Sequence, residues 1–156
     1  MSRKRGLSAL CVLLLSTILL YSCGDVIVEP KWTIGVKGAD VAVFSSLDYA
    51  KLHEVTITTE REQQDNSIME ETWKGVYMKD VLDYLEITDY SSITIVSSDD
   101  SSVEYMPAII NDSLTILATG LNGKDIAHED GYTKIIAGNQ PEDMWIERPA
   151  KISVNR

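Results

Sequence analysis

Short hydrophobic runs constrain the fold of this chain more than any other feature. From Trp32 onward, runs that alternate or are rich in β-branched residues cover 32–36, 41–44, 55–58, 93–96, 103–106, 114–118, 132–137 and 152–154. Such runs, bounded by polar and glycine residues, are typical of β-strands. We therefore expect a single α+β domain with more strand than helix.

Two segments favour short helices. Met78, Val81, Leu82 and Leu85 are spaced at i, i+3, i+4 and i+7, which predicts a helical stripe of two turns. The other segment is Ser45-Ser46-Leu47-Asp48, which offers a hydroxyl for a helix N-cap and an acid in the first turn, and this helix should reach about residue 52.

Turns and loops are predicted between these elements. Residues 60–66 are all polar and predict an exposed loop, and Lys74-Gly75 predicts a turn. Residues 97–102 predict a polar turn that contains Asp99 and Asp100. Asn122-Gly123 is a strong signal for a tight hairpin turn.

The first 23 residues resemble a bacterial lipoprotein signal. A basic start at residues 3–5 precedes an apolar stretch over 7–21, which is shorter than the roughly 20 residues that span a membrane. Ser22-Cys23 follows, although Tyr21 is larger than the residue usual at its position. The resemblance implies a signal peptide over 1–22, a lipidated Cys23, a tether over 23–31 and a domain over 32–156. The alternative is an uncleaved anchor.

A lipoprotein of this kind would be attached to the bacterial cell envelope, facing the periplasm or the outside. Cleavage would remove three of the 14 basic residues and none of the 24 acidic ones, so the net charge would change from −10 to −13. An acidic balance argues against nucleic acid as a partner. The segment 24–156 has no cysteine, which excludes a cysteine nucleophile, a disulfide and a cysteine-ligated metal site there.

The order of the motifs resembles the molybdopterin-binding domain of the sulfite oxidase-like oxidoreductases. The resemblance rests on four stretches of the sequence. The first comprises residues 32–36, 44–48 and 55–58, and the second is a Trp73-x-Gly75-Val76 segment with its helix to 82. The third comprises 117–118, 121–124 and 130–132, and the fourth comprises 144–146 and 150–154. The resemblance implies that family's mostly-β fold, and it covers nearly all of residues 32–154.

The residues that hold the cofactor in that family are missing at the matching positions. The enzymes carry a metal-binding cysteine just after the second strand, where this chain has Thr58-Thr59-Glu60-Arg61-Glu62. Several Arg and His residues hold the pterin phosphate in the enzymes, but after residue 22 this chain has only Arg61, Arg148 and Arg156. Asp130 stands where the family often has His. We therefore expect no cofactor, with molybdopterin as the disfavoured alternative.

The resemblance implies that the loop 59–66 and the turns 99–102 and 128–131 converge near one rim of a cleft, whose candidate residues also include one tryptophan. The candidate residues are Glu60, Arg61, Trp73, Asp99, Asp100, His128 and Asp130. The rim would be negative, which favours a neutral or cationic small ligand, or a basic partner surface. Most of them have a plainer alternative. His128-Glu129-Asp130 and Asp99-Asp100 suit exposed turns, and Trp73, like Trp145, suits core packing. We expect no catalytic residue and no metal ligand.

Three function classes follow. The first is a non-catalytic binding or interaction lipoprotein on this fold, whose partner is a small ligand or another envelope protein. The second is a molybdopterin-dependent oxidoreductase with an altered metal site. The third is a structural subunit that docks on a membrane redox partner.

Overall fold

The computed structural model describes residues 28–62 and 65–156. The predicted signal peptide, Cys23, most of the tether, and residues 63–64 therefore lie outside the described residues, and the boundaries at 22 and 31 stay predictions. The strands are β1 (Thr33–Lys37), β2 (Val43–Ser45), β3 (Val55–Glu62), β4 (Ile68–Tyr77), β5 (Ser92–Ser97), β6 (Ser102–Tyr105), β7 (Thr115–Leu121), β8 (Lys124–Asp125), β9 (Lys134–Ala137), β10 (Ile146–Glu147) and β11 (Pro149–Asn155). The helices are α2 (Ser46–Tyr49), α3 (Met78–Tyr84) and α4 (Pro107–Ile110), with 3₁₀ turns η1 (His128–Asp130) and η2 (Glu142–Met144).

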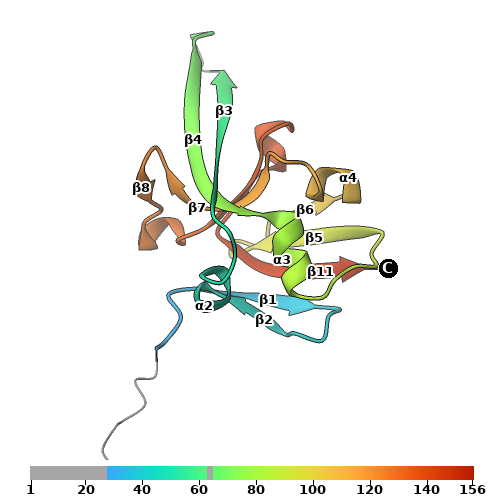
Figure 1. Cartoon of the computed structure of the whole chain (residues 1–156). Helices are drawn as coiled ribbons and strands as arrows, with labels where there is room; N and C mark the ends of the chain where they lie inside the picture. The colour runs from blue at the N-terminus through green and yellow to red at the C-terminus, as the bar shows by residue number, and fades with distance from the viewer. Residues whose placement is uncertain (1–27, 63–64) are drawn as a thin grey trace, which may run out of the picture.

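The strands form two sheets (Figure 1). One has the order β2-β1-β11-β5-β6, and the other has the order β10-β9-β7-β4-β3 with β8 paired to β7. β1 and β11 run parallel, and the remaining neighbours are antiparallel. The prediction of a single mostly-β domain with short helices is confirmed. Among the described residues, no helix has the length and apolar character needed to cross a bilayer.

The main core lies where the two sheets and α3 meet. It includes Ile95 and Ile152 of the first sheet, Leu117 and Ile135 of the second, and Leu82 of α3. A smaller core covers the other face of the second sheet, with Ile57, Trp73, Ile116, Ala118, Ile126 and Ile136. Both faces of β7 and β9 are therefore buried, which explains why these strands are continuous apolar runs without alternation.

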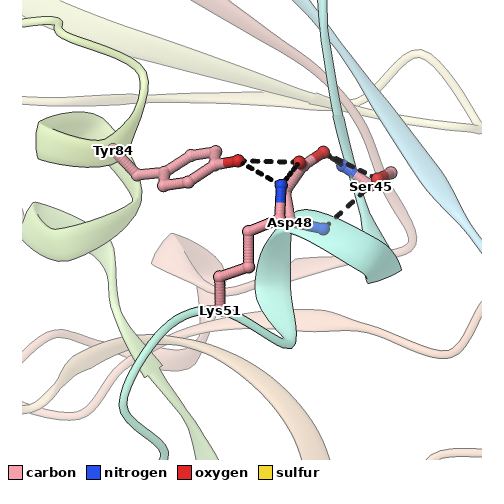
Figure 2. Close-up of polar contacts among 4 residues, drawn as sticks. All are labelled: Ser45, Asp48, Lys51 and Tyr84. Atoms are coloured by element: carbon pink, nitrogen blue, oxygen red, sulfur yellow. Dashed lines mark hydrogen bonds and ion pairs between the residues drawn. The ribbon is translucent and has the colours of Figure 1, made fainter.

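Both predicted helices are present. The buried stripe of α3 consists of Met78, Val81 and Leu82, and Leu85 is buried just beyond its end. α2 begins after Ser45, which forms a capping box with Asp48, and it ends at Tyr49, earlier than expected. Figure 2 shows that Asp48 also joins the two helices: its carboxylate accepts hydrogen bonds from Lys51 and from the Tyr84 hydroxyl of α3.

The loop predicted over 60–66 is wrong for its first half. β3 continues to Glu62 and pairs with β4 in regular register, for example Glu60 with Glu70 and Arg61 with Met69. The two strands form a hairpin that projects from the body of the domain (Figure 1). Polar residues form strand here because the neighbouring backbone satisfies their amide groups while their side chains reach water.

The turn predicted at Lys74-Gly75 is also wrong. Both residues lie within β4, at an irregularity in its pairing with β7. Glycine is required because a Cβ at residue 75 would lie 2.3 Å from the Leu117 carbonyl oxygen. The tight turn at Asn122-Gly123 is confirmed: it joins β7 to β8, and both residues have positive φ.

Candidate functional site

A small cleft lies between the β3–β4 hairpin and the strands β9 and β10. Its volume is about 110 Å³. We name it the Glu71 cleft, and it is lined by Arg61, Glu71, Trp73, Lys134, Ile135, Ile136, Glu142, Trp145, Ile146 and Glu147. The lining combines aromatic surface with five charged side chains, a composition that sets it apart from the apolar cores.

Two tryptophans form its aromatic part. The rings of Trp73 and Trp145 lie 5.8 Å apart and nearly perpendicular. The indole Nε1–H of Trp73 donates to Thr59 Oγ1 at 3.1 Å, and that of Trp145 donates to the Ala137 carbonyl at 3.0 Å. Both rings are therefore held in place, and both indole N–H groups already have acceptors within the protein.

Glu71 is the unusual residue of the cleft, because it is a carboxylate only 4% exposed. Alternation along β4 buries Glu71 on the same side as Trp73. Its Oε1 lies 3.7 Å from a terminal nitrogen of Arg61, and its Oε2 has no hydrogen-bond partner among the described residues. A buried carboxylate oxygen without a partner is costly, so its presence calls for an explanation.

The other charges of the cleft form pairs. Arg61 is about half-exposed, and its Nε lies 2.7 Å from Glu142 Oε1. Lys134 Nζ lies 2.8 Å from Glu147 Oε1, and this bond lowers the pKa of the Glu147 carboxyl. Both lining cations are thus engaged by acids of the same chain. Three carboxylates stand against two cations, which leaves the cleft with an excess of negative charge.

Of the predicted cleft residues, the structure places Arg61 and Trp73 in the Glu71 cleft. Glu60 is exposed and precedes Arg61 on β3, so it faces the other side of the hairpin.

The remaining predicted residues lie on two neighbouring turns. Arg148 joins these turns, since its guanidinium donates to the Glu129 carbonyl at 2.5 Å and its own carbonyl accepts from the Ser98 amide at 3.0 Å. The Ser101 side chain, and the Ser101 amide that donates to Asp99 at 2.9 Å, lower the pKa of the Asp99 carboxyl. The Ser97 hydroxyl, at the start of the same turn, donates to the Glu147 carbonyl at 2.6 Å. The turns therefore flank the cleft without lining it.

Each turn is also held by local geometry. Asp100 takes a left-handed backbone conformation, His128 packs against the ring of Tyr132 at 5.1 Å, and Asp130 ends the short η1 turn. Among residues 28–62 and 65–156, no group of three or more His, Cys, Asp or Glu side chains is arranged to hold a metal ion.

Sequence reasoning missed four charged residues of the cleft: Glu71, Lys134, Glu142 and Glu147. The signal for Glu71 was present, because residues 71, 73 and 75 alternate on one strand, but it was hidden by the turn expected at Lys74-Gly75. Glu142 and Glu147 reach the cleft through the tertiary packing of η2 and β10, which local pattern does not reveal.

A larger cavity of about 390 Å³ lies on the α2 side of the domain. Several of its polar groups contact one another. The Tyr49 hydroxyl donates to Glu54 and is paired with Thr119 Oγ1, and Lys74 lies 3.7 Å from Glu54 and 3.5 Å from Asp125.

The family of this two-sheet domain is shown by comparison with protein-family models. The family model described as "Oxidoreductase molybdopterin binding domain" matches residues 25–133, and the chain belongs to this family. The resemblance inferred from the sequence is thereby confirmed.

One solved structure with a similar fold is the sulfane dehydrogenase SoxCD from Paracoccus pantotrophus. The two are 15% identical, with a TM-score of 0.69, and the match covers 82% of this chain. It covers 40% of the SoxCD chain, so this protein spans about two fifths of that length. No curated protein matches the sequence.

The residues of the Glu71 cleft do not fit molybdopterin. The segment that would carry the metal-binding cysteine is regular strand, and there Thr59 is buried as the acceptor of the Trp73 N–H. The nearby cations Arg61 and Lys134 are paired with carboxylates, and Glu71 adds a buried acid. An anionic pterin phosphate would meet acids where it requires free cations.

Proposed function

We propose that this protein is a lipid-anchored, non-catalytic binding module of the bacterial cell envelope, built on a divergent molybdopterin-binding domain. One observation carries the proposal. Both cations of the Glu71 cleft are paired within the chain, while the buried Glu71 carboxylate keeps an oxygen without a partner among the described residues. A cleft with this balance attracts neutral or cationic groups and repels anions.

The anchoring part of the proposal is supported by the sequence. Cys23 follows a basic start and an apolar stretch of the length found in signal peptides. Two acyl chains on such a cysteine suffice for stable membrane attachment. The membrane, through this anchor, and another envelope protein are the expected partners.

The second candidate function is a redox-complex subunit, or an oxidoreductase with an altered metal site. Family membership favours it, as does the fold shared with part of the larger SoxCD chain. As a redox-complex subunit, the domain would serve a partner that carries the remaining chemistry.

The test is metal and cofactor analysis of the full-length protein purified from membranes. We expect molybdenum well below one atom per chain, no pterin absorbance, and no heat of binding on titration with molybdopterin or sulfite. Stoichiometric molybdenum or tight pterin binding would overturn the proposal. Recovery of a membrane redox enzyme in a pull-down from envelope extracts would favour the second candidate.

A further inference from the structure

We propose that the Glu71 cleft binds a guanidinium group, with the Glu71 carboxylate as its anchor and Arg61 as an internal competitor. This inference rests on the proposed function, because it names the ligand chemistry of the same cleft. A guanidinium offers planar N–H donors to carboxylates and stacks on aromatic rings.

The first step concerns the unpartnered oxygen. Glu71 is almost fully buried and lines the cleft, and its Oε2 has no hydrogen-bond partner among the described residues. This oxygen is closed to solvent, so a donor can reach it only when a neighbouring side chain of the cleft, such as Arg61, moves aside. A positive donor is favoured, because charge-assisted hydrogen bonds are roughly twice as strong as neutral ones.

The second step concerns the tryptophans. Their N–H groups are engaged by Thr59 and Ala137, so neither ring offers a donor. Trp73 is only 2% exposed and belongs to the smaller core, so the half-buried Trp145 is the tryptophan that offers carbon surface to the cleft. Aromatic surface next to a carboxylate suits a cation and does not suit an anion.

The third step concerns Arg61, which shows that the cleft accepts a guanidinium. Its Nε contacts Glu142 at 2.7 Å, but its nearest approach to Glu71 is 3.7 Å, beyond a good hydrogen bond. Arg61 therefore lies beside the Glu71 carboxylate without forming a good hydrogen bond to it. It comes from the projecting hairpin and is about half-exposed, so an incoming guanidinium can compete with it.

The fourth step concerns size. A volume of about 110 Å³ is well below the roughly 300–1,000 Å³ of pockets that hold whole ligands. The cleft therefore takes a head group, and the rest of the ligand stays outside. The guanidinium group belongs either to a small guanidinium compound or to an arginine side chain of a partner protein.

The experiment is a titration of the full-length protein in detergent, followed by calorimetry and tryptophan fluorescence. The probes are Nα-acetyl-argininamide, its neutral isostere Nα-acetyl-citrullinamide, and methylguanidine. We expect saturable binding of the arginine probe that weakens as salt rises, and no binding of the citrulline probe. If methylguanidine binds as well as the arginine probe, the natural ligand is a small guanidinium compound. If methylguanidine binds clearly more weakly than the arginine probe, the natural ligand is an arginine side chain.

Two variants locate the site. Glu71→Gln should weaken binding of the arginine probe by about tenfold or more, because the anchoring charge is lost. Glu70→Gln is the matched control: it makes the same charge change on an exposed neighbour and should leave affinity within about twofold. Arg61→Gln should tighten binding, since the internal competitor is removed.

The outcomes separate the two proposals. No binding of the arginine probe at millimolar concentration, equal binding of the citrulline probe, or unchanged affinity in Glu71→Gln would overturn the guanidinium site and leave the proposed function standing. Tight pterin binding would overturn the proposed function itself. If Glu71→Gln fails to fold, the binding of the arginine probe and of the citrulline probe to the unaltered protein still tests the guanidinium site.

Discussion

Asp48 illustrates how much one residue can contribute to this fold. Its carboxylate accepts from the Ser45 hydroxyl at 2.7 Å and from the Tyr84 hydroxyl at 2.8 Å, and it lies 3.0 Å from Lys51 Nζ (Figure 2). These contacts, the Ser45 hydrogen bond foremost, lower the pKa of Asp48 from 3.8 to about 2. The charged form is therefore favoured in the folded state.

We predict that Asp48→Asn lowers the free energy of unfolding at pH 7 by about 1–2 kcal/mol. A depressed folded pKa stabilises the protein above the unfolded value of 3.8, and the contribution is lost as the pH falls from about 4 to about 2. Urea unfolding at pH 7, 4 and 2 should show the difference between the proteins shrinking. Asp40→Asn, at an exposed position, serves as control.

Glu71 is the second residue whose environment makes a prediction. Because its buried Oε2 has no partner among the described residues, Glu71→Gln should change the free energy of unfolding at pH 7 by less than about 1 kcal/mol. A much larger loss, measured by urea unfolding, would mean that Glu71 stabilises the hairpin through Arg61, and that its burial has a structural explanation.

At the scale of elements, β4 connects the projecting hairpin to the body of the domain. Its irregularity at Lys74-Gly75 lets β7 approach closely, and a Cβ at residue 75 would meet the Leu117 carbonyl oxygen at 2.3 Å and Ala118 Cα at 2.8 Å. Since these are backbone atoms within a sheet, they cannot move aside cheaply.

We therefore predict that Gly75→Ala destabilises the protein by about 3 kcal/mol. Gly35→Ala is the control, because a Cβ there meets its nearest atom at an ordinary 3.6 Å, and it should cost less than about 1 kcal/mol. Thermal melts of both variants would check this. Equal melting temperatures would contradict the packing explanation.

Local pattern predicted the elements whose cause is local. The stripe of α3, the Ser45 cap and the Asn122-Gly123 turn each depend on neighbours in the sequence. The outer half of the β3–β4 hairpin was missed because Glu60 to Glu62 have no apolar residue, and their strand depends on pairing with β4. The Glu71 cleft was missed in part for the same reason, since β3, β4, β9, η2 and β10 all contribute to it.

At the scale of the whole molecule, the described residues build two cores without a metal-binding group of three or more His, Cys, Asp or Glu side chains. We predict that a chelator leaves the melting temperature of the purified protein unchanged within about 1–2 °C. A structural ion contributes folding energy directly, so a large drop in melting temperature with chelator would reveal one.

The last prediction concerns where the molecule is held. If Cys23 carries two acyl chains, the Cys23→Ser variant should remain unprocessed or leave the detergent-soluble membrane fraction, because the lipid supplies the attachment. Cell fractionation and the mass of the purified protein would measure both effects. Ser22→Ala is the control, since a small residue before the cysteine should preserve processing. Unchanged processing and membrane attachment of Cys23→Ser would instead support the alternative of an uncleaved anchor, with Cys23 an ordinary cysteine.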